Sequence, residues 1–183
     1  MINTIVHSKL PPGNKTFHRV FDEEASVTFA GFETTANTLR LILYHIYTND
    51  DILKRLRREV TSVPADSSGI RPLNKLEQLP YLTAVLKEDL RLSPAVATRA
   101  ARITDKDLFY MNWRIPAGTP VGMTTSLLHT DDEWYPEPMS FRPERWIGST
   151  AQGASDAIFA PFSRGTRVCL GMQCVHLNFK LNQ

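Results

Sequence analysis

Residues 162–171 read FSRGTRVCLG, and this stretch decides how the whole chain is interpreted. Its pattern is F-x-x-G-x-R-x-C-x-G, with a single cysteine, Cys169, between two glycines. A cysteine thiolate is a ligand for a soft metal such as haem iron, and it must be kept from protonation and oxidation. Gly165 and Gly171 allow the backbone to approach a flat group and to direct amide N–H groups at the sulfur. The competing interpretation is a glycine-containing loop with a buried free cysteine. It does not explain why the pattern has five fixed positions, which are Phe162, Gly165, Arg167, Cys169 and Gly171.

Two side chains near the cysteine fit a flat, anionic cofactor. Arg167 lies two residues before Cys169 and carries a planar guanidinium that suits a propionate carboxylate. Phe162 is expected to cover the ring and to exclude water. The stretch therefore predicts Cys169 as a thiolate ligand for a metal such as haem iron, with Arg167 and Phe162 as cofactor-binding residues.

A zinc cluster is the rival metal site, because Cys174 and His176 follow Cys169 closely. Tetrahedral zinc needs four ligands, usually from two closely spaced pairs, and the sequence offers no second pair. We therefore interpret Cys174 as a small hydrophobic side chain on the helix that follows the ligand.

Composition narrows the class of protein without naming it. The chain has 183 residues, 42% hydrophobic and 22% charged, which is typical of a globular protein with a core. Its net charge of +2 argues against a nucleic-acid partner, and two cysteines cannot form a disulfide framework. The longest apolar run, residues 39–46, is interrupted by Arg40 and His45 and is too short to span a membrane.

Helical patterns come first along the chain and strand patterns follow. A helix is predicted over residues 17–47, with apolar side chains on more than one side, so we expect it to run through a core. An amphipathic helix with a stripe of Ile52, Leu53, Leu56 and Val60 follows, then a loop over 61–72 and a helix over 79–92.

Short strands are predicted at 97–103, 108–111, 113–115 and 119–122, and an irregular stretch at 130–161. Asn112 and Gly118 occupy turns that are expected to need a positive φ. Helices followed by strands predict a mostly α protein of the α+β type.

The cysteine stretch resembles that of the cytochrome P-450 family of haem-thiolate monooxygenases. The resemblance covers nearly the whole chain and implies the C-terminal portion of that fold, with a long central helix, a small β-sheet and the cysteine-ligand loop. It implies haem b (iron protoporphyrin IX) as the cofactor.

Residues 30–35, AGFETT, match the oxygen-binding stretch of the family. Gly31 in a helix interior destabilises the helix by about 1 kcal/mol relative to alanine. Close approach of a ligand such as O2 would explain why a glycine stands there. Glu33 beside Thr34 suits proton delivery, with Glu33 connecting to solvent and Thr34 ordering a water or donating to dioxygen. The run is not specific by itself, because threonine pairs are common in helices; together with the cysteine motif it predicts catalytic residues.

Glu88 and Arg91 form an E-x-x-R pair that lies on one face of a helix. Exposed pairs of this kind are common. The resemblance implies a buried triad with Arg145, from the PERW segment at 143–146, that fixes the cysteine loop.

Arg102 fits the position where the family often places an arginine against a haem propionate. Arg99 is the alternative, and strand alternation predicts that only one of the two reaches the haem. An exposed strand arginine is the competing interpretation for both. His129, in the sequence LHTD, is interpreted as structural.

The resemblance implies a monooxygenase that inserts one atom of O2 into a small, largely apolar organic substrate, with electrons from NADPH through a cytochrome P-450 reductase. The motifs look most like those of fungal members, which suggests secondary metabolism. Two alternatives remain: a truncated, non-catalytic remnant, and a haem-binding module without oxygenase activity. Glu33 and the two threonines after it argue against the binding module, since binding alone needs no proton relay.

The resemblance also implies that residues 1–183 form a single partial domain. An N-terminal part with a membrane anchor and a terminal sheet are expected to be missing, and the anchor would be the only contact with a membrane. For a full-length member this implies the endoplasmic reticulum membrane. The tail after Gly171 is more polar than the apolar helix of the family.

Overall fold

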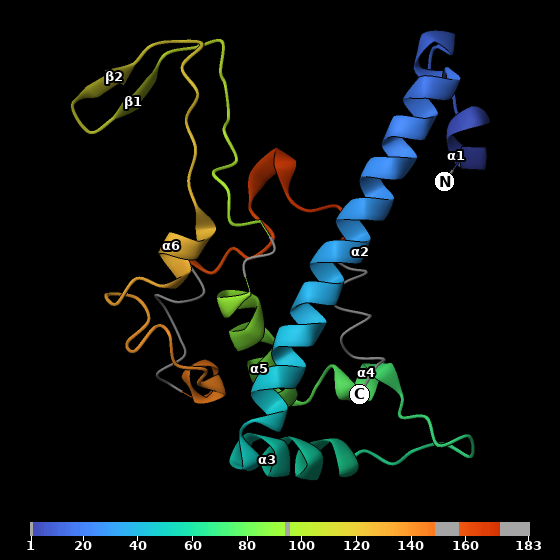
Figure 1. Ribbon diagram of the computed structural model, residues 1–183, viewed down its shortest axis with the longest axis vertical. Helices are drawn as coiled ribbons and strands as arrows, with labels where there is room; N and C mark the ends of the chain where they lie inside the picture. The colour runs from blue at the N-terminus through green and yellow to red at the C-terminus, as the bar shows by residue number, and fades with distance from the viewer. Residues whose placement is uncertain (1, 94–95, 149–157, 173–183) are drawn as a thin grey trace.

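The computed structural model describes residues 2–93, 96–148 and 158–172. Its helices are α1 (Ile2–Val6), α2 (Phe17–Tyr47), α3 (Asp50–Thr61), α4 (Leu73–Leu76), α5 (Pro80–Leu92) and α6 (Thr125–His129). Its strands are β1 (Leu108–Tyr110) and β2 (Trp113–Ile115), and short 3-10 turns occur at Pro12–Lys15, Pro143–Trp146 and Gly165–Arg167. The structure confirms the prediction of a mostly helical protein with a small sheet (Figure 1).

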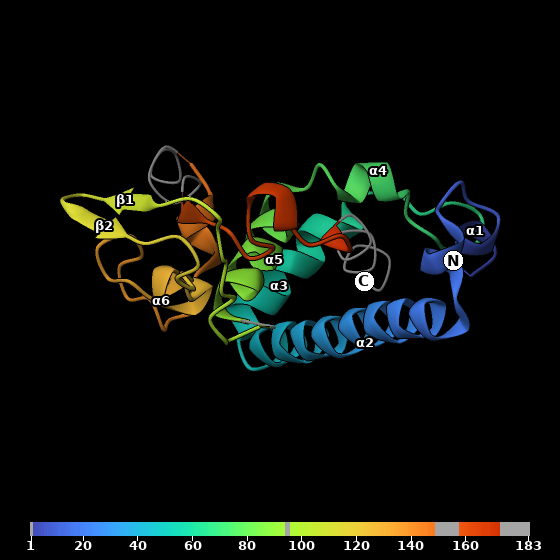
Figure 2. The ribbon, with the colours of Figure 1, turned by 90° about the horizontal axis from the view of Figure 1, so that it is seen from above.

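The long helix α2 has the bounds that the sequence predicts. The Thr16 hydroxyl accepts a hydrogen bond from the Arg19 amide at 3.4 Å and caps its first turn. At 31 residues it is the longest described element, and α3 and α5 lie against its C-terminal part (Figures 1 and 2). No helix in the described ranges combines the length and the apolar character needed to cross a bilayer.

The expectation that α2 runs through a core along its length is wrong. Its buried residues are Val20, Thr38, Ile42 and Ile46, most of them in the C-terminal part. Phe21, Phe29 and Phe32 are 59%, 70% and 69% exposed, because the N-terminal half extends away from α3 and α5 (Figure 2).

The core lies where α2, α3 and α5 meet. The predicted stripe of α3 is buried at Ile52, Leu56 and Val60, with Leu53 partly buried. These side chains pack against the end of α2 and against α5. The buried cluster consists of Ile42, Ile46, Ile52, Leu56, Val60, Val63, Leu76, Tyr81, Leu82, Val85 and Leu86. Burial of these apolar side chains is the main force that holds the three helices together.

A carboxylate from α3 caps the start of α5. Leu79, the residue before the helix, offers no capping side chain, and Pro80 takes the first helical position. Glu59 instead accepts hydrogen bonds from the Tyr81 amide at 2.9 Å and from the Leu82 amide at 2.7 Å. Its negative charge also suits the positive end of the helix dipole. The contact therefore fixes α5 against α3.

Strands β1 and β2 form an antiparallel hairpin in which Leu108 pairs with Ile115 and Tyr110 with Trp113. The predicted strands at 108–111 and 113–115 are thus confirmed to within one residue. The positive φ falls on Met111 (51°), the first residue of the two-residue loop, and not on Asn112 as predicted. Gly118 has the expected positive φ of 82°.

The predicted strands at 97–103 and 119–122 are wrong. These segments meet only at an isolated antiparallel bridge between Arg102 and Val121. A Cβ at Gly122 would lie 2.9 Å from Arg99 Cγ, so the close approach of the segments requires glycine there. One bridge does not make a ladder, and a strand needs a partner along its length. The irregular stretch is confirmed over 130–148 apart from the short turn Pro143–Trp146.

We predict that Glu59→Ala lowers the free energy of unfolding by about 1–2 kcal/mol, the usual loss for a helix cap. Urea denaturation followed by circular dichroism measures it. Glu24→Ala, which removes a glutamate from α2 outside this contact, is the control and is expected to change stability by less than about 0.5 kcal/mol. Equal effects of the two substitutions would contradict the capping role.

Candidate functional site

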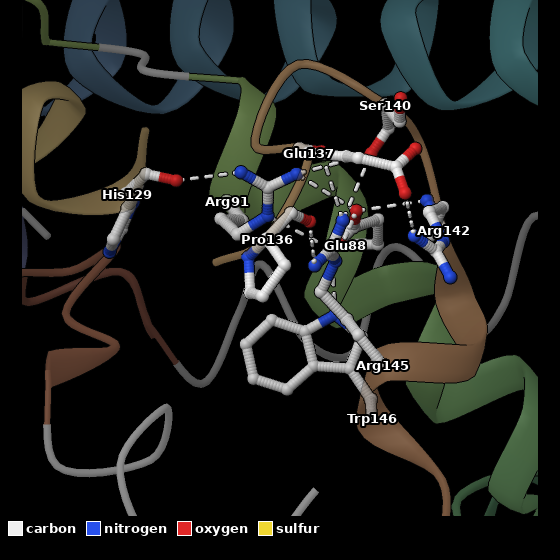
Figure 3. A network of polar contacts seen from close by, with 9 residues as sticks. All are labelled: Glu88, Arg91, His129, Pro136, Glu137, Ser140, Arg142, Arg145 and Trp146. Atoms are coloured by element: carbon white, nitrogen blue, oxygen red, sulfur yellow. Dashed lines mark hydrogen bonds and ion pairs between the residues drawn. The ribbon is translucent and has the colours of Figure 1, made fainter. Parts of the chain in front are cut away.

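The described structure contains a buried carboxylate, Glu88, on which several parts of the chain converge (Figure 3). Its side chain has no exposure to solvent. Arg91, one helical turn later, donates from Nε to Oε2 at 3.0 Å and from Nη2 to Oε1 at 2.9 Å. Arg145 donates from Nε to Oε1 at 2.9 Å. The structure thus brings Glu88, Arg91 and Arg145 together in the arrangement that the resemblance implies.

Two further donors complete the shell of Glu88. The Arg142 amide donates to Oε1 at 2.9 Å, and the Trp146 indole donates to Oε2 at 2.8 Å. Neither donor was predicted from the sequence, although the indole N–H of a buried tryptophan is a donor that needs an acceptor. Both oxygens of Glu88 are therefore engaged from α5 and from the turn Pro143–Trp146.

The guanidinium groups of Arg91 and Arg145 also donate hydrogen bonds to backbone carbonyls of the irregular stretch. Arg91 Nη1 donates to the His129 carbonyl at 2.6 Å. Arg145 donates to the carbonyls of Pro136, Glu137 and Ser140 at 3.1, 3.3 and 3.3 Å. Figure 3 shows these carbonyls grouped around the two arginines. The network thereby holds residues 129–146 against α5.

The charges of this network decide the protonation state of Glu88. Burial alone would raise the pKa of its carboxyl. The hydrogen bonds and charge of Arg91, the Arg142 amide and the charge of Arg145 outweigh burial and hold the pKa of Glu88 below its usual range. Glu88 is therefore a buried carboxylate that stays ionised.

A cavity of about 300 Å³ lies beside this network. Thr34 and Thr35 of α2 line it, together with Arg102 and with Phe162, Arg167 and Cys169 of the segment 158–172. Figures 1 and 2 show that segment, coloured red, running from the neighbourhood of α6 towards α2. The cavity therefore collects residues of both predicted motifs.

The backbone of the cysteine segment folds back on itself. The Cys169 amide donates to the Phe162 carbonyl at 3.0 Å, and the Val168 amide donates to the Gly165 carbonyl at 3.1 Å. Gly165 has a φ of +78°, a conformation that favours glycine, while the predicted close approach of a flat group to this residue stays a prediction. At Gly171 an added Cβ would lie 3.9 Å from the Cys169 sulfur, which is ordinary contact. Cys169 itself is a free, exposed thiol.

Not every predicted site residue lines the cavity. Gly31 and Glu33 are exposed on α2 outside the lining, and a Cβ at Gly31 would meet no atom within 4 Å. Arg99 lines a separate hollow beside Gly122, so of the two candidate arginines it is Arg102 that shares the cavity with Cys169. The roles of Gly31 and Glu33 stay predictions.

The residues of this cavity fit a thiolate-ligated haem. A free thiol, two guanidinium groups and an aromatic ring border one space, which suits a metal, two carboxylates and a flat macrocycle. Within the described ranges no group of three His, Cys, Asp or Glu side chains is placed to hold a metal ion, so a clustered site of the zinc type is not found there. Cys174 and His176 lie outside the described residues, as does the polar tail beyond Met172.

The family model described as Cytochrome P450 matches residues 16–181. The chain belongs to the cytochrome P450 family. Its relatives include the cytochrome P450 monooxygenase SAT11 of Stachybotrys chartarum, 41% identical over 174 residues that make up 94% of this chain and 33% of that protein.

The cytochrome P450 monooxygenase tndB of Aspergillus flavipes is 47% identical over 172 residues, which are 92% of this chain and 35% of that protein. The N-acetyltryptophan 6-hydroxylase ivoC of Emericella nidulans is 40% identical over 182 residues, 97% of this chain and 35% of that protein. The chain therefore spans about one third of the length of these relatives. Membership of the family implies a haem cofactor.

Asp89, next to Glu88, is a second buried carboxyl with a different environment. It is 1% exposed, and neither of its side-chain oxygens has a hydrogen-bond partner among the described residues. Burial, and then the negative charge of Glu88, raise the pKa of Asp89 to about 8. The site thus holds one ionised carboxylate beside one that is protonated at neutral pH.

We predict that Asp89→Leu stabilises the protein, and that the gain increases with pH. Below the ordinary pKa of 3.8 the carboxyl is protonated in both the folded and the unfolded chain. As pH rises towards about 8, the unfolded chain ionises while the folded chain does not, so the free energy of unfolding of the natural chain falls. Urea denaturation should show a gain for the variant that is larger near pH 8 than near pH 4 by several kcal/mol, since one unit of pKa shift corresponds to about 1.4 kcal/mol.

The natural chain and Asp89→Leu share all other titrating groups, including Glu88. The difference between their free energies of unfolding therefore reports on Asp89 to first order. A difference that does not change with pH would contradict the assignment.

Proposed function

We propose that this chain forms the haem-holding part of a monooxygenase that inserts one atom of dioxygen into a small, largely apolar organic substrate. The observation that carries the proposal is the shared cavity, in which Cys169 lies with Arg102, Arg167 and Thr34. The fungal relatives are named as monooxygenases, which supports the same reaction class. We extend the proposal to haem b as cofactor, electrons from NADPH through a P450 reductase, and a role in fungal secondary metabolism.

Four side chains would hold the cofactor. Cys169 would bind the iron through its thiolate, and the adjacent turn Gly165–Arg167 orients the residues before it. Arg167 and Arg102 would each pair with a propionate, since a guanidinium fork matches a carboxylate. Phe162 would cover one side of the ring and exclude water from the sulfur. When bound, the haem would supply the activation of dioxygen.

Thr34 and Glu33 would handle protons. The Thr34 hydroxyl donates to the Ala30 carbonyl at 2.6 Å, so its oxygen is oriented to accept a hydrogen bond from a water in the cavity. Glu33, the preceding residue, is exposed and would exchange protons with solvent. A proton would therefore pass from Glu33 through an ordered water to the neighbourhood of Thr34.

Several residues that line the cavity are apolar, which suits an apolar substrate. Val96, Ala100 and Met123 border the cavity, and the threonines present methyl groups as well as hydroxyls. We propose a small, largely apolar substrate on this basis. For the full-length protein we propose the endoplasmic reticulum membrane as the location, with residues 1–183 as a partial domain; both rest on the family resemblance.

We predict that the chain expressed with haem, reduced and exposed to carbon monoxide shows a Soret band at about 450 nm, as expected for thiolate-ligated haem. Cys169→Ser should remove this band, because a hydroxyl does not replace a thiolate ligand. Glu24→Ala, on α2 outside the residues that line the cavity, is the control and should retain it.

The band's persistence in Cys169→Ser would show that another residue binds the iron. Complete absence of haem uptake by the natural chain would instead favour a non-catalytic remnant.

A further inference from the structure

His129, at the end of α6, accepts one hydrogen bond at its backbone carbonyl and one at its imidazole ring. Its carbonyl oxygen accepts from Arg91 Nη1 at 2.6 Å, and its ring Nε2 accepts from the Ala160 amide at 3.1 Å. Figure 3 shows the carbonyl directed at Arg91 and the imidazole directed away from it. One residue thus contacts both the Glu88 network and the segment that leads to Cys169.

The hydrogen bonds continue from Ala160 to the cysteine. The Ala160 carbonyl accepts from the Ser163 amide at 3.0 Å, where Ser163 has a φ of +64°. The neighbouring Phe162 carbonyl accepts from the Cys169 amide at 3.0 Å. The orientation of the Ala160 peptide is therefore coupled to the turn that places Cys169.

Aromatic packing holds the ring of His129 in this position. Its ring is stacked on Phe159, with centroids 5.6 Å apart and planes at 29°, and it meets Tyr135 edge-on at 6.3 Å. Phe159 in turn packs on Trp146, which donates to Glu88. The imidazole is thus held between the network and the cysteine segment, and it also lines the cavity.

The ring of His129 is suited to accept a hydrogen bond. Its residue is 2% exposed, and burial, followed by the charge of Arg91, lowers the pKa of His129 to about 4. The imidazole is therefore neutral at physiological pH. With the Ala160 amide donating to Nε2, the single ring proton lies on Nδ1.

We propose that His129 is a positioning residue that couples the Glu88–Arg91–Arg145 network to the cysteine segment by accepting the Ala160 amide at Nε2. It acts through Ala160 and Phe162 on Cys169. Its relevance to iron ligation rests on the function proposed above, whereas the coupling itself is a property of the chain without haem.

Three substitutions at this position separate the acceptor from the ring. His129→Phe keeps a ring to pack on Phe159 but has no acceptor. His129→Gln has no ring but places a carbonyl oxygen near the position of Nε2. His129→Asn, the matched control, places its oxygen near the position of Nδ1 and falls short of the Ala160 amide.

The first readout needs no haem. Amide hydrogen exchange at Ala160 and Ser163, measured in the 183-residue chain, should be about five- to tenfold faster in His129→Phe and His129→Asn than in the natural chain. His129→Gln should restore protection to within about twofold. Unchanged exchange in His129→Phe, or no rescue by His129→Gln, would overturn the proposal.

The second readout is the fraction of bound haem that shows the thiolate band after reduction and carbon monoxide. We expect this fraction to fall in His129→Phe and to recover in His129→Gln. Equal fractions in the natural chain and His129→Phe would overturn the coupling to the ligand. If the natural chain itself shows no thiolate band, the proposed function fails, while the exchange measurement still decides whether His129 couples the two parts.

Discussion

A carboxylate from which water is excluded, Glu88, is the constraint on which the rest of the structure depends. An ionised carboxyl in a protein interior costs several kcal/mol unless hydrogen bonds and opposite charges replace its hydration. Arg91, Arg145, the Arg142 amide and the Trp146 indole provide that replacement from two separate parts of the chain. Satisfying one charge therefore requires α5 and residues 142–146 to meet in a single arrangement.

The same requirement determines where the cavity forms. The arginines that neutralise Glu88 use their remaining donors on carbonyls between His129 and Ser140, in a stretch with little regular structure to hold it. The ring of His129 then meets the Ala160 amide, and the cysteine segment follows. Cys169 and Arg167 of that segment line one cavity with Arg102 and with Thr34 of α2. A buried ion network of this kind is weak evidence for net stability, because the desolvation penalty can exceed the Coulombic gain.

Local patterns in the sequence were sufficient for some of these features. Glu88 and Arg91 are three residues apart, so helix geometry alone places them on one face, and residues 17–47 carry their own periodicity and cap. The partners of His129 and Trp146 are 31 and 58 residues away, and no local spacing indicates such contacts. The strand pattern at 97–103 failed because strand propensity depends on a paired neighbour. Likewise, the periodicity of residues 17–47 indicates where the apolar side chains of α2 lie on the helix, but it does not indicate which of them other parts of the chain cover.

Haem content per chain tests most directly whether the compensated charge of Glu88 holds Cys169 in place for iron. Glu144 provides a control, since it pairs with Arg55 at 3.0 Å but is 53% exposed, where an ion pair contributes little. We predict that Glu88→Ala binds no thiolate-ligated haem, while the natural chain and Glu144→Ala bind it equally. Unchanged haem content and an unchanged carbon monoxide band in Glu88→Ala would contradict the account.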